Sequence, residues 1–235
     1  MLILSAEDSC GKTVKGRCMG MPGWEKAQNH IYAGDEPFGF DMPGVNFIEY
    51  MIERHNIKLV IIDPFMSFTE KKDMNQTHEV KQIMSPMNKV AQRNNCVILL
   101  INHLNKSTSQ AAQYRSIGSI GILGSVRSQF LVGEDPNDRT RVALVHAKSN
   151  LAVKGETLLY RVKQLSLTEG EFRWEGTSDL NKDTLLAQAN SKPTQGEEIE
   201  RWPPPLATST AIFAESQPLP KPGSPEIITS SPSGK

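Results

Sequence analysis

Acidic and imidazole side chains follow three apolar segments of the sequence, each of the length of a β-strand. Glu7 follows M-L-I-L-S, Asp63 ends K-L-V-I-I-D, and His103 follows C-V-I-L-L-I-N. Apolar runs of this length predict strands that are covered on both faces of a parallel sheet. Because the carboxyl ends of parallel strands meet at one edge of a sheet, we expect the three side chains to share that edge.

The three residue types suit phosphoryl transfer. A carboxylate such as Glu7 can orient and deprotonate an attacking water, and Asp63 can hold Mg²⁺ through its water shell. The neighbouring amide and imidazole of Asn102 and His103 can sense a γ-phosphate by hydrogen bonding. Each residue alone also has a structural explanation: a helix cap for Glu7, a turn for Asp63 and a solvated imidazole for His103. Their combination on successive strands indicates a phosphoryl-transfer site.

The segment A-E-D-S-C-G-K-T, residues 6–13, also fits a permissive phosphate-binding fingerprint that ends in Gly-Lys-Thr. A working loop of this kind presents backbone N–H groups through flexible glycines and leads into a stable helix. This stretch has one glycine, and the carboxylates of Glu7 and Asp8 stand where phosphate oxygens would lie. The match is therefore interpreted as a coincidence. A small kinase or GTPase that uses Gly11, Lys12 and Thr13 remains the alternative.

The periodicity of the remaining sequence predicts an α/β domain. Apolar residues at helical spacing mark helices over residues 45–55 and 77–94, and Pro86 should kink the second helix. These helices alternate with strands over residues 57–63 and 96–102, so strand–helix–strand units with right-handed crossovers build a mostly parallel sheet. Further strands are predicted at residues 126–132, 141–147, 157–162 and 171–174.

The composition points to no particular partner and to no membrane. The 26 Lys and Arg residues balance the 26 Asp and Glu residues, so a nucleic-acid contact must come from a local patch. The three cysteines have neither metal-ligand spacing nor even pairing, which indicates a reduced cytoplasmic protein. No apolar run reaches the ~18 residues of a membrane span. Nine of the 15 prolines lie beyond residue 190, which predicts a folded domain over residues 1–178 and a disordered tail or linker over residues 179–235.

The chain contains five phrases in the following order between residue 1 and about residue 163: S-A-E-D-S, V-I-I-D-P, L-L-I-N-H-L-N-K-S, Y-R-S-I-G-S-I with G-S-V-R-S, and H-A-K-S-N-L-A. In order and spacing they resemble the RecA-like ATPases, and most closely the RepA-like branch of AAA-type ATPases, the ring helicases of plasmids, phages and integrated elements. The resemblance implies a RecA-like P-loop NTPase core. In that family the first strand and the P-loop precede S-A-E-D, so both are expected to be missing here.

The resemblance also implies a role for each matching residue. Glu7 would be the catalytic base, Asp63 the acid that holds Mg²⁺ through water, and His103 the sensor of the γ-phosphate. Lys148 would reach the nucleotide bound by the neighbouring subunit. Arg127 would be a second cation of this kind, or else a residue buried against an acid. ATP and Mg²⁺ would be ligands of the complete protein, while the chain alone would bind ATP weakly or not at all.

The partners that the resemblance implies are sibling subunits and DNA. The chain would assemble into a homo-oligomeric ring, with a hexamer as the expected size. A mobile loop over residues 105–119 would face the central channel, where Lys106 and Arg115 would contact the backbone of single-stranded DNA. Asn150 stands where ring helicases usually place a finger arginine, which argues against a strong arginine finger. The alternative to a helicase motor is a non-catalytic remnant that binds sibling subunits or DNA.

Overall fold

The computed structural model describes residues 1–19, 21, 23–36, 38–69, 72–74, 76–103, 120–164 and 170–188. Its first part is a parallel sheet in the order β2-β1-β3-β4, formed by β1 (Leu2–Ser5), β2 (Tyr32–Gly34), β3 (Leu59–Asp63) and β4 (Val97–Leu100). Ile61 of β3 pairs with Ile3 on one side and with Leu99 on the other. Three of these strands were predicted, with bounds one to three residues longer, whereas β2 was not.

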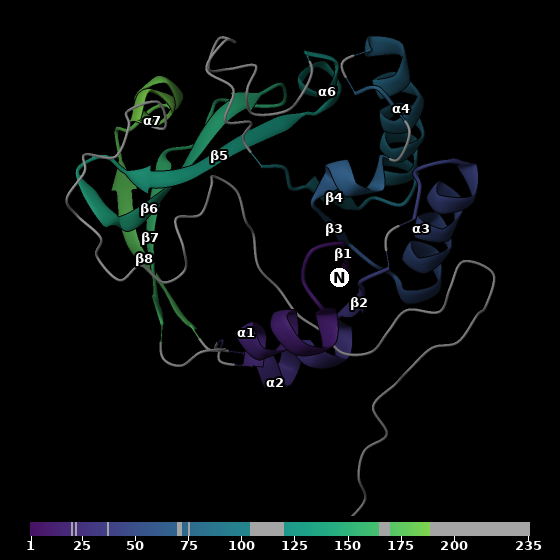
Figure 1. Ribbon diagram of the computed structural model, residues 1–235, viewed down its shortest axis with the longest axis horizontal. Helices are drawn as coiled ribbons and strands as arrows, with labels where there is room; N and C mark the ends of the chain where they lie inside the picture. Colours follow the sequence, from purple (N-terminus) through teal and green to yellow (C-terminus); the bar gives the residue numbers. More distant parts are fainter. Residues whose placement is uncertain are drawn as a thin grey trace, which may run out of the picture.

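Helices cover both faces of the parallel sheet (Figure 1). The helices α3 (Met42–His55) and α4 (Thr77–Arg93) lie on one face. The other face carries a π-helical turn, η1 (Cys10–Val14), and the short helices α1 (Lys15–Met19) and α2 (Trp24–Ala27). Two 3₁₀ turns, η2 (Gln28–His30) and η3 (Phe65–Phe68), follow α2 and β3. None of the described helices is long and apolar enough to cross a bilayer. The predicted parallel sheet flanked by helices is confirmed.

The apolar strands have this arrangement because both of their faces are buried. Alternate residues such as Leu2, Leu4 and Ile62 pack against α3 and α4, while Ile3 and Ile61 pack on the side of α1. Each of these side chains is at most 4% exposed. Burial of one such side chain contributes about 1.5–3 kcal/mol, so the strand ends that carry polar residues are held by a rigid core.

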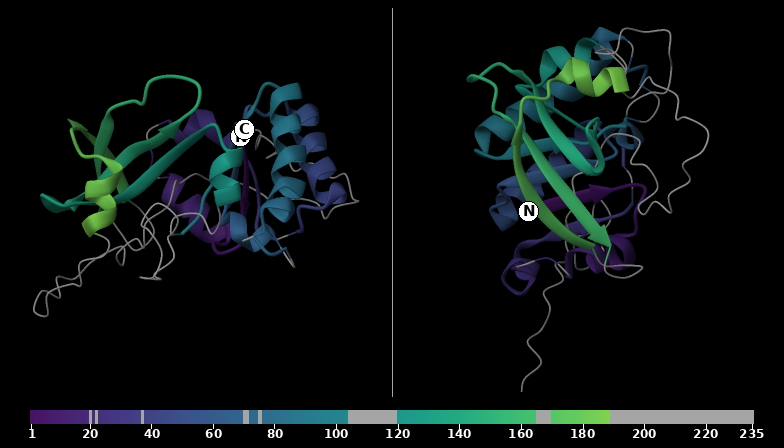
Figure 2. Two further views of the ribbon diagram at one scale, coloured as in Figure 1. Left: turned by 90° about the horizontal axis from the view of Figure 1, so that it is seen from above. Right: turned by 90° about the vertical axis from the view of Figure 1, so that its left-hand side faces the viewer.

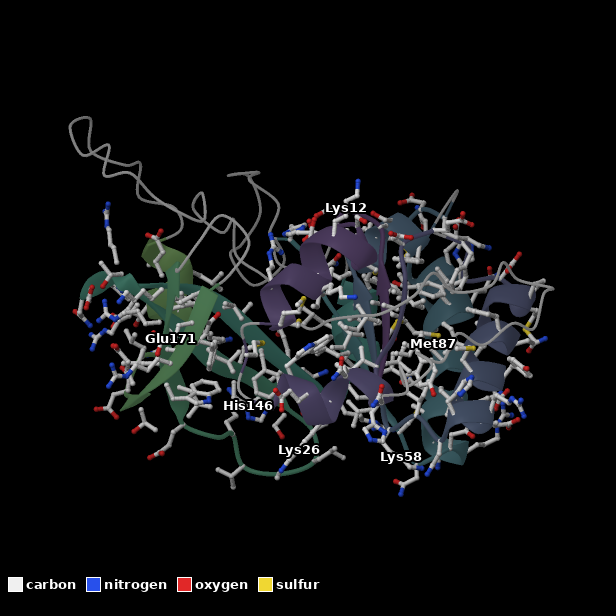
Figure 3. The ribbon with its side chains drawn as sticks, turned by 90° about the horizontal axis from the view of Figure 1, so that it is seen from below. Lys12, Lys26, Lys58, Met87, His146 and Glu171 are labelled. Carbon is white, nitrogen blue, oxygen red and sulfur yellow. The ribbon has the colours of Figure 1, made fainter. Side chains whose placement is uncertain are left out.

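The two long helices follow the predicted apolar stripes. In α3 the carboxylate of Asp41 caps the first turn by accepting a hydrogen bond from the Gly44 N–H at 3.0 Å, and Asn56 ends the helix in the left-handed conformation. In α4 the buried stripe comprises Val80, Ile83, Met84, Met87 and Val90, and Figure 3 shows where Met87 lies within it. The helix continues through Pro86.

The second part of the chain forms a separate antiparallel sheet in the order β5-β6-β7-β8 (Figures 1 and 2). Its strands are β5 (Ser128–Asp135), β6 (Asp138–Ser149), β7 (Thr157–Gln164) and β8 (Gly170–Ser178). The helix α6 (Ile120–Ser125) precedes β5 and lies against α4. All four strands were predicted, but they pair with one another and extend the parallel sheet nowhere within the described residues.

A last helix, α7 (Lys182–Gln188), packs on the antiparallel sheet. Its Leu185 and Leu186 are 4% and 5% exposed and contact Leu131 and Val145 of the sheet. The composition assigned this segment to the tail, but two adjacent leucines give the helix enough apolar surface to fold onto the strands. The rest of the predicted tail, residues 189–235, lies outside the described residues.

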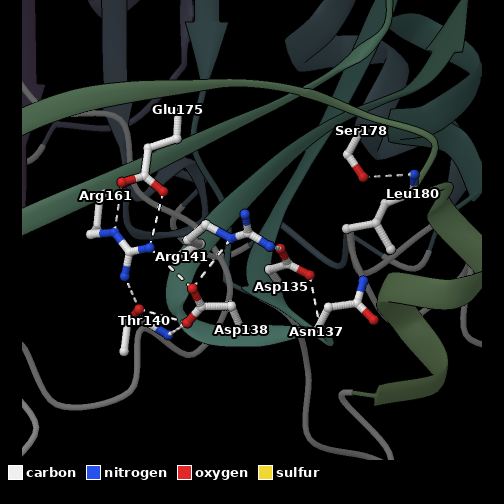
Figure 4. Close-up of polar contacts among 9 residues, drawn as sticks. All are labelled: Asp135, Asn137, Asp138, Thr140, Arg141, Arg161, Glu175, Ser178 and Leu180. Atoms are coloured by element: carbon white, nitrogen blue, oxygen red, sulfur yellow. Dashed lines mark hydrogen bonds and ion pairs between the residues drawn. The ribbon is translucent and has the colours of Figure 1, made fainter.

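A network of charged side chains fastens the turn between β5 and β6 to the far strands (Figure 4). Arg161 of β7 binds Asp138 at 3.0 Å, Glu175 at 2.7 Å and the hydroxyl of Thr140. Beside it, Arg141 pairs with the fully buried Asp135 at 2.7 Å. Buried charges require such partners, because leaving one unpaired costs several kcal/mol. The network therefore fixes the register of the antiparallel sheet.

Candidate functional site

Three of the predicted site residues meet at the carboxyl edge of the parallel sheet. The strands β1, β3 and β4 are neighbours, and Ser5 is in register with Asp63. Two backbone hydrogen bonds continue the pairing beyond the strands: Ala6 N–H donates to the Asp63 carbonyl at 2.8 Å, and Phe65 N–H donates to the Ile101 carbonyl at 2.7 Å. The residues that follow the strands are therefore held side by side.

Glu7 and His103 are in direct contact at this edge. Oε2 of Glu7 lies 3.2 Å from Nε2 of His103, although the two residues are 96 positions apart in the sequence. Their side chains are 58% and 41% exposed. The pair is thus open to solvent, where a water or a phosphate group can reach both side chains.

Asp63 is electrostatically coupled to this pair. Partial burial at the end of β3, together with the negative charge of Glu7, raises the pKa of the Asp63 carboxyl to about 6. His103 and Arg17 act on this pKa in the opposite direction. The ionised form of Asp63 is consequently destabilised, and a cation placed beside it would favour that form.

The structure adds three charged residues that the sequence reasoning did not assign to this edge. Asp8 forms an ion pair with Arg17 of α1 at 2.8 Å. Asp35, directly after β2, accepts a hydrogen bond from the Cys10 N–H at 3.1 Å. The one sequence signal for Asp35 is its position directly after the short run I-Y-A-G. No sequence signal connects Arg17 with Asp8.

The Gly-Lys-Thr segment lies in the turn η1, in which several backbone donors are already bound. The N–H of Cys10 is bound to Asp35, and the N–H groups of Thr13 and Val14 donate to the Ser9 carbonyl at 2.9 and 3.2 Å. Lys12 is exposed and projects away from the helices, on the opposite side of the molecule from Lys58 (Figure 3). These contacts favour the interpretation that the match to a phosphate-binding loop is a coincidence.

Lys12→Ala is therefore expected to leave the nucleotide affinity of this chain unchanged within twofold, because the lysine takes no part in a phosphate cradle. Calorimetric titration with ATP and Mg²⁺ measures this. Lys58→Ala, an exposed lysine at the amino end of β3, is the matched control. A low-micromolar affinity that Lys12→Ala abolishes and Lys58→Ala retains would restore the kinase or GTPase alternative.

The donor set at the edge fits Mg²⁺ bound together with phosphate. Mg²⁺ prefers oxygen ligands and usually takes one or two carboxylates, the remainder being water and phosphate oxygens. Asp63 supplies such a carboxylate, and Oδ1 of Asn102, two residues beyond β4, is buried without a hydrogen-bond partner. Among the described residues no group of three or more His, Cys, Asp or Glu side chains is arranged to hold a metal on its own.

The other predicted site residues lie apart from this edge or outside the description. Lys148, in β6, donates hydrogen bonds from Nζ to the carbonyls of Leu123 and Val126, the latter at 3.1 Å, and so holds the end of α6. Arg127 is exposed, and no acid in the described ranges pairs with it, so its predicted burial against an acid is not seen. Lys106 and Arg115 fall in residues 104–119, outside the described residues.

The fold and the edge define a parallel α/β sheet with acids and an imidazole at its carboxyl end. Residues 21–109, which include Asp63 and His103, match the family described as an AAA domain. Among solved structures, the RadB recombinase is similar with a TM-score of 0.47 and 13% sequence identity, over 69% of this chain and 74% of that chain. No curated protein matches the chain significantly. The family match supports a relationship to AAA-type ATPase domains.

Proposed function

We propose that the chain is part of a RecA-like ATPase core, similar to those of RepA-type ring helicases, in which ATP hydrolysis drives DNA unwinding or translocation. One observation carries the proposal: the side chains that follow three adjacent parallel strands converge, with Glu7 and His103 in contact and Asp63 coupled to both. A base, a metal-binding acid and a neutral sensor are what phosphoryl transfer to water requires at one place.

Each residue has a distinct task in this proposal. Glu7 accepts the proton of the attacking water, and its contact with His103 places the sensor of the γ-phosphate beside the base. Asp63 holds Mg²⁺ through water, which returns its pKa toward that of an ordinary carboxyl. Bound ATP and Mg²⁺ supply the transferable phosphoryl group and a cation that neutralises its developing charge. The residues of this chain orient the water, move its proton and register the γ-phosphate.

The proposal assigns the phosphate cradle to a segment other than Gly11-Lys12-Thr13. β4 lies at the edge of the parallel sheet, and no strand within the described ranges pairs with its outer side. Its sequence V-I-L-L is wholly apolar, and Val97 is 61% exposed. Such an edge is suited to accept a further strand, and a parallel one would end next to His103. Without that strand we expect the chain to bind ATP weakly or not at all.

In the proposed ring, Lys148 acts on the nucleotide of the neighbouring subunit. It lies on the antiparallel sheet, away from the Glu7–His103 pair, and its ammonium group is held by carbonyls at the end of α6. The loop that contains Lys106 and Arg115 would contact single-stranded DNA in the channel. We place the protein in the cytoplasm, because a reducing compartment fits the free cysteines Cys10, Cys18 and Cys96.

Lys148→Ala in the complete protein is expected to lower ATP hydrolysis at least ~10-fold in the assembled ring, because it removes a cation from the transition state. Turnover is measured above and below the concentration at which the ring forms, as followed by sedimentation. Lys154→Ala, which changes an exposed lysine in the loop after β6, is the control. Equal loss of activity in ring and monomer would contradict the action between subunits and indicate that Lys148 only supports α6.

A further inference from the structure

One face of the antiparallel sheet carries two groups of aromatic rings that no helix covers in the described part of the chain. We call it the aromatic face; its residues are Phe130, His146, Tyr160, Phe172 and Trp174. Phe130 stacks on His146 with ring centroids 4.5 Å apart, and Phe172 contacts Tyr160 at 4.9 Å and Trp174 at 4.8 Å. The rings come from all four strands, because cross-strand neighbours share a face.

The two faces of this sheet differ in how they are covered. The opposite face is closed by α7, whose leucines pack with Leu131, Ala143, Val145 and Leu159. On the aromatic face, Trp174 is 55% exposed and Phe130 is 48% exposed, whereas Tyr160 between them is only 8% exposed. Large apolar side chains gathered in this way usually mark a binding surface, since their exposure to water is unfavourable.

The alternation of side chains restricts what the aromatic face can bind. Arg161 and Lys163 alternate with Tyr160 along β7, and Arg173 lies between Phe172 and Trp174 in β8. These cations therefore point to the other face, where Arg161 is already bound by Asp138 and Glu175. On β6, Lys148 lies two residues beyond His146 and so shares the aromatic side, but its ammonium group is held by the carbonyls of Leu123 and Val126. Within the described strands β7 and β8, this face therefore offers few phosphate contacts to a nucleic acid, and it favours an apolar peptide.

The chain itself contains a peptide of suitable chemistry. Residues 201–206 read R-W-P-P-P-L. Consecutive prolines favour the extended polyproline II conformation, and aromatic-lined surfaces bind such segments because little ordering entropy is lost. The described chain ends at Gln188, at the end of α7. The 12 residues between it and Arg201 can span up to about 40 Å, while a four-stranded sheet is only about 20 Å wide. The segment can therefore pass around the sheet from α7 to the aromatic face.

We propose that the segment Trp202–Leu206 docks on the aromatic face of its own chain, with the proline rings packed against Trp174 and its neighbours. The docking would cover the exposed rings and bring the proline-rich tail back onto the folded domain. The inference does not depend on the proposed ATPase role, because it concerns a different surface and needs no nucleotide.

Fluorine NMR of the full chain labelled with 5-fluorotryptophan tests this. The protein has three tryptophans, Trp24, Trp174 and Trp202, and each resonance is assigned by a Trp→Phe substitution. Replacing Pro203, Pro204 and Pro205 together by serine should shift the Trp174 and Trp202 resonances. Trp24 packs against the core beside α1, and its resonance should stay unchanged as an internal check of folding.

The matched control replaces three other prolines of the tail, Pro218, Pro220 and Pro222, by serine and should move neither resonance. In the reciprocal test, Trp174→Ala should shift the Trp202 resonance. Docking within one chain further requires that the Trp174 resonance is independent of protein concentration. The proposal is overturned if Trp174 does not respond to Pro203–Pro205, if both triple variants shift it equally, or if the response appears only at high concentration, which would assign the face to a second copy.

Discussion

Glu7→Gln is expected to lower the ATP turnover of the complete protein at least ~100-fold, within the range that loss of a general base produces. Glutamine has nearly the same shape and can keep the contact with Nε2 of His103, which lies 3.2 Å from the native carboxylate. It cannot accept a proton from water. Steady-state turnover measures the loss, and binding of a fluorescent ATP analogue should change less than about threefold, because Glu7 is not assigned to hold the nucleotide.

Glu53→Gln is the control for this substitution. Glu53 is an exposed glutamate of α3, which covers one face of the sheet and does not lie at its carboxyl edge. The variant should retain full turnover. If Glu7→Gln is as active as Glu53→Gln, then Glu7 is not the base and the converging side chains have another purpose.

Asp63→Asn is expected to stabilise the folded chain by about 1–2 kcal/mol at pH 8, although it removes a proposed catalytic residue. The native pKa of about 6 lies above the ~3.9 of an unfolded chain. Between these values the folded state binds more protons, so the free energy of unfolding falls as the pH rises through that window and stays low above it. Asparagine cannot ionise, so the variant does not lose this stability. The expected gain of about 1–2 kcal/mol is smaller than the full pKa difference implies, because solvent screens the charges at the partly open edge.

Urea unfolding of the chain at pH 4 and pH 8 measures this effect. The gain from Asp63→Asn should be present at pH 8 and nearly vanish at pH 4, where the native carboxyl is already protonated. Asp179→Asn, at an exposed aspartate after β8, should show no such difference. A destabilised Asp63→Asn variant at pH 8 would mean that the native carboxylate is stabilised by a partner instead of strained by burial and by Glu7.

The buried strands and the position of the site could be predicted because both depend on local sequence. An apolar run such as L-V-I-I fits only a strand covered on both faces, and a polar residue at its carboxyl end must lie at the sheet edge. Glu7, Asp63 and His103 therefore come together as expected, while the functions assigned to them remain proposals. The stripes of α3 and α4 were equally clear, since they cover the length of each helix.

What the sequence did not predict depends on partners distant in the chain. β2 has only the three residues Y-A-G, and it is a strand because β1 offers an edge to pair with. The ion pair between Asp8 and Arg17 arises from the path of α1. The antiparallel pairing of β5 and β6 had a local signal that was overlooked: Pro136 and Asn137 form a tight turn in which the Asp135 carboxylate accepts a hydrogen bond from the Asn137 N–H at 2.9 Å.

The most direct test of the account is the titration of the Asp63 carboxyl carbon by NMR, in the native chain and in Glu7→Gln. If the ends of β1 and β3 share one electrostatic environment, the native midpoint lies near pH 6 and moves lower when Glu7 loses its charge. A midpoint near pH 4 in the native chain, or one that Glu7→Gln leaves in place, would show that these carboxylates do not form a common site.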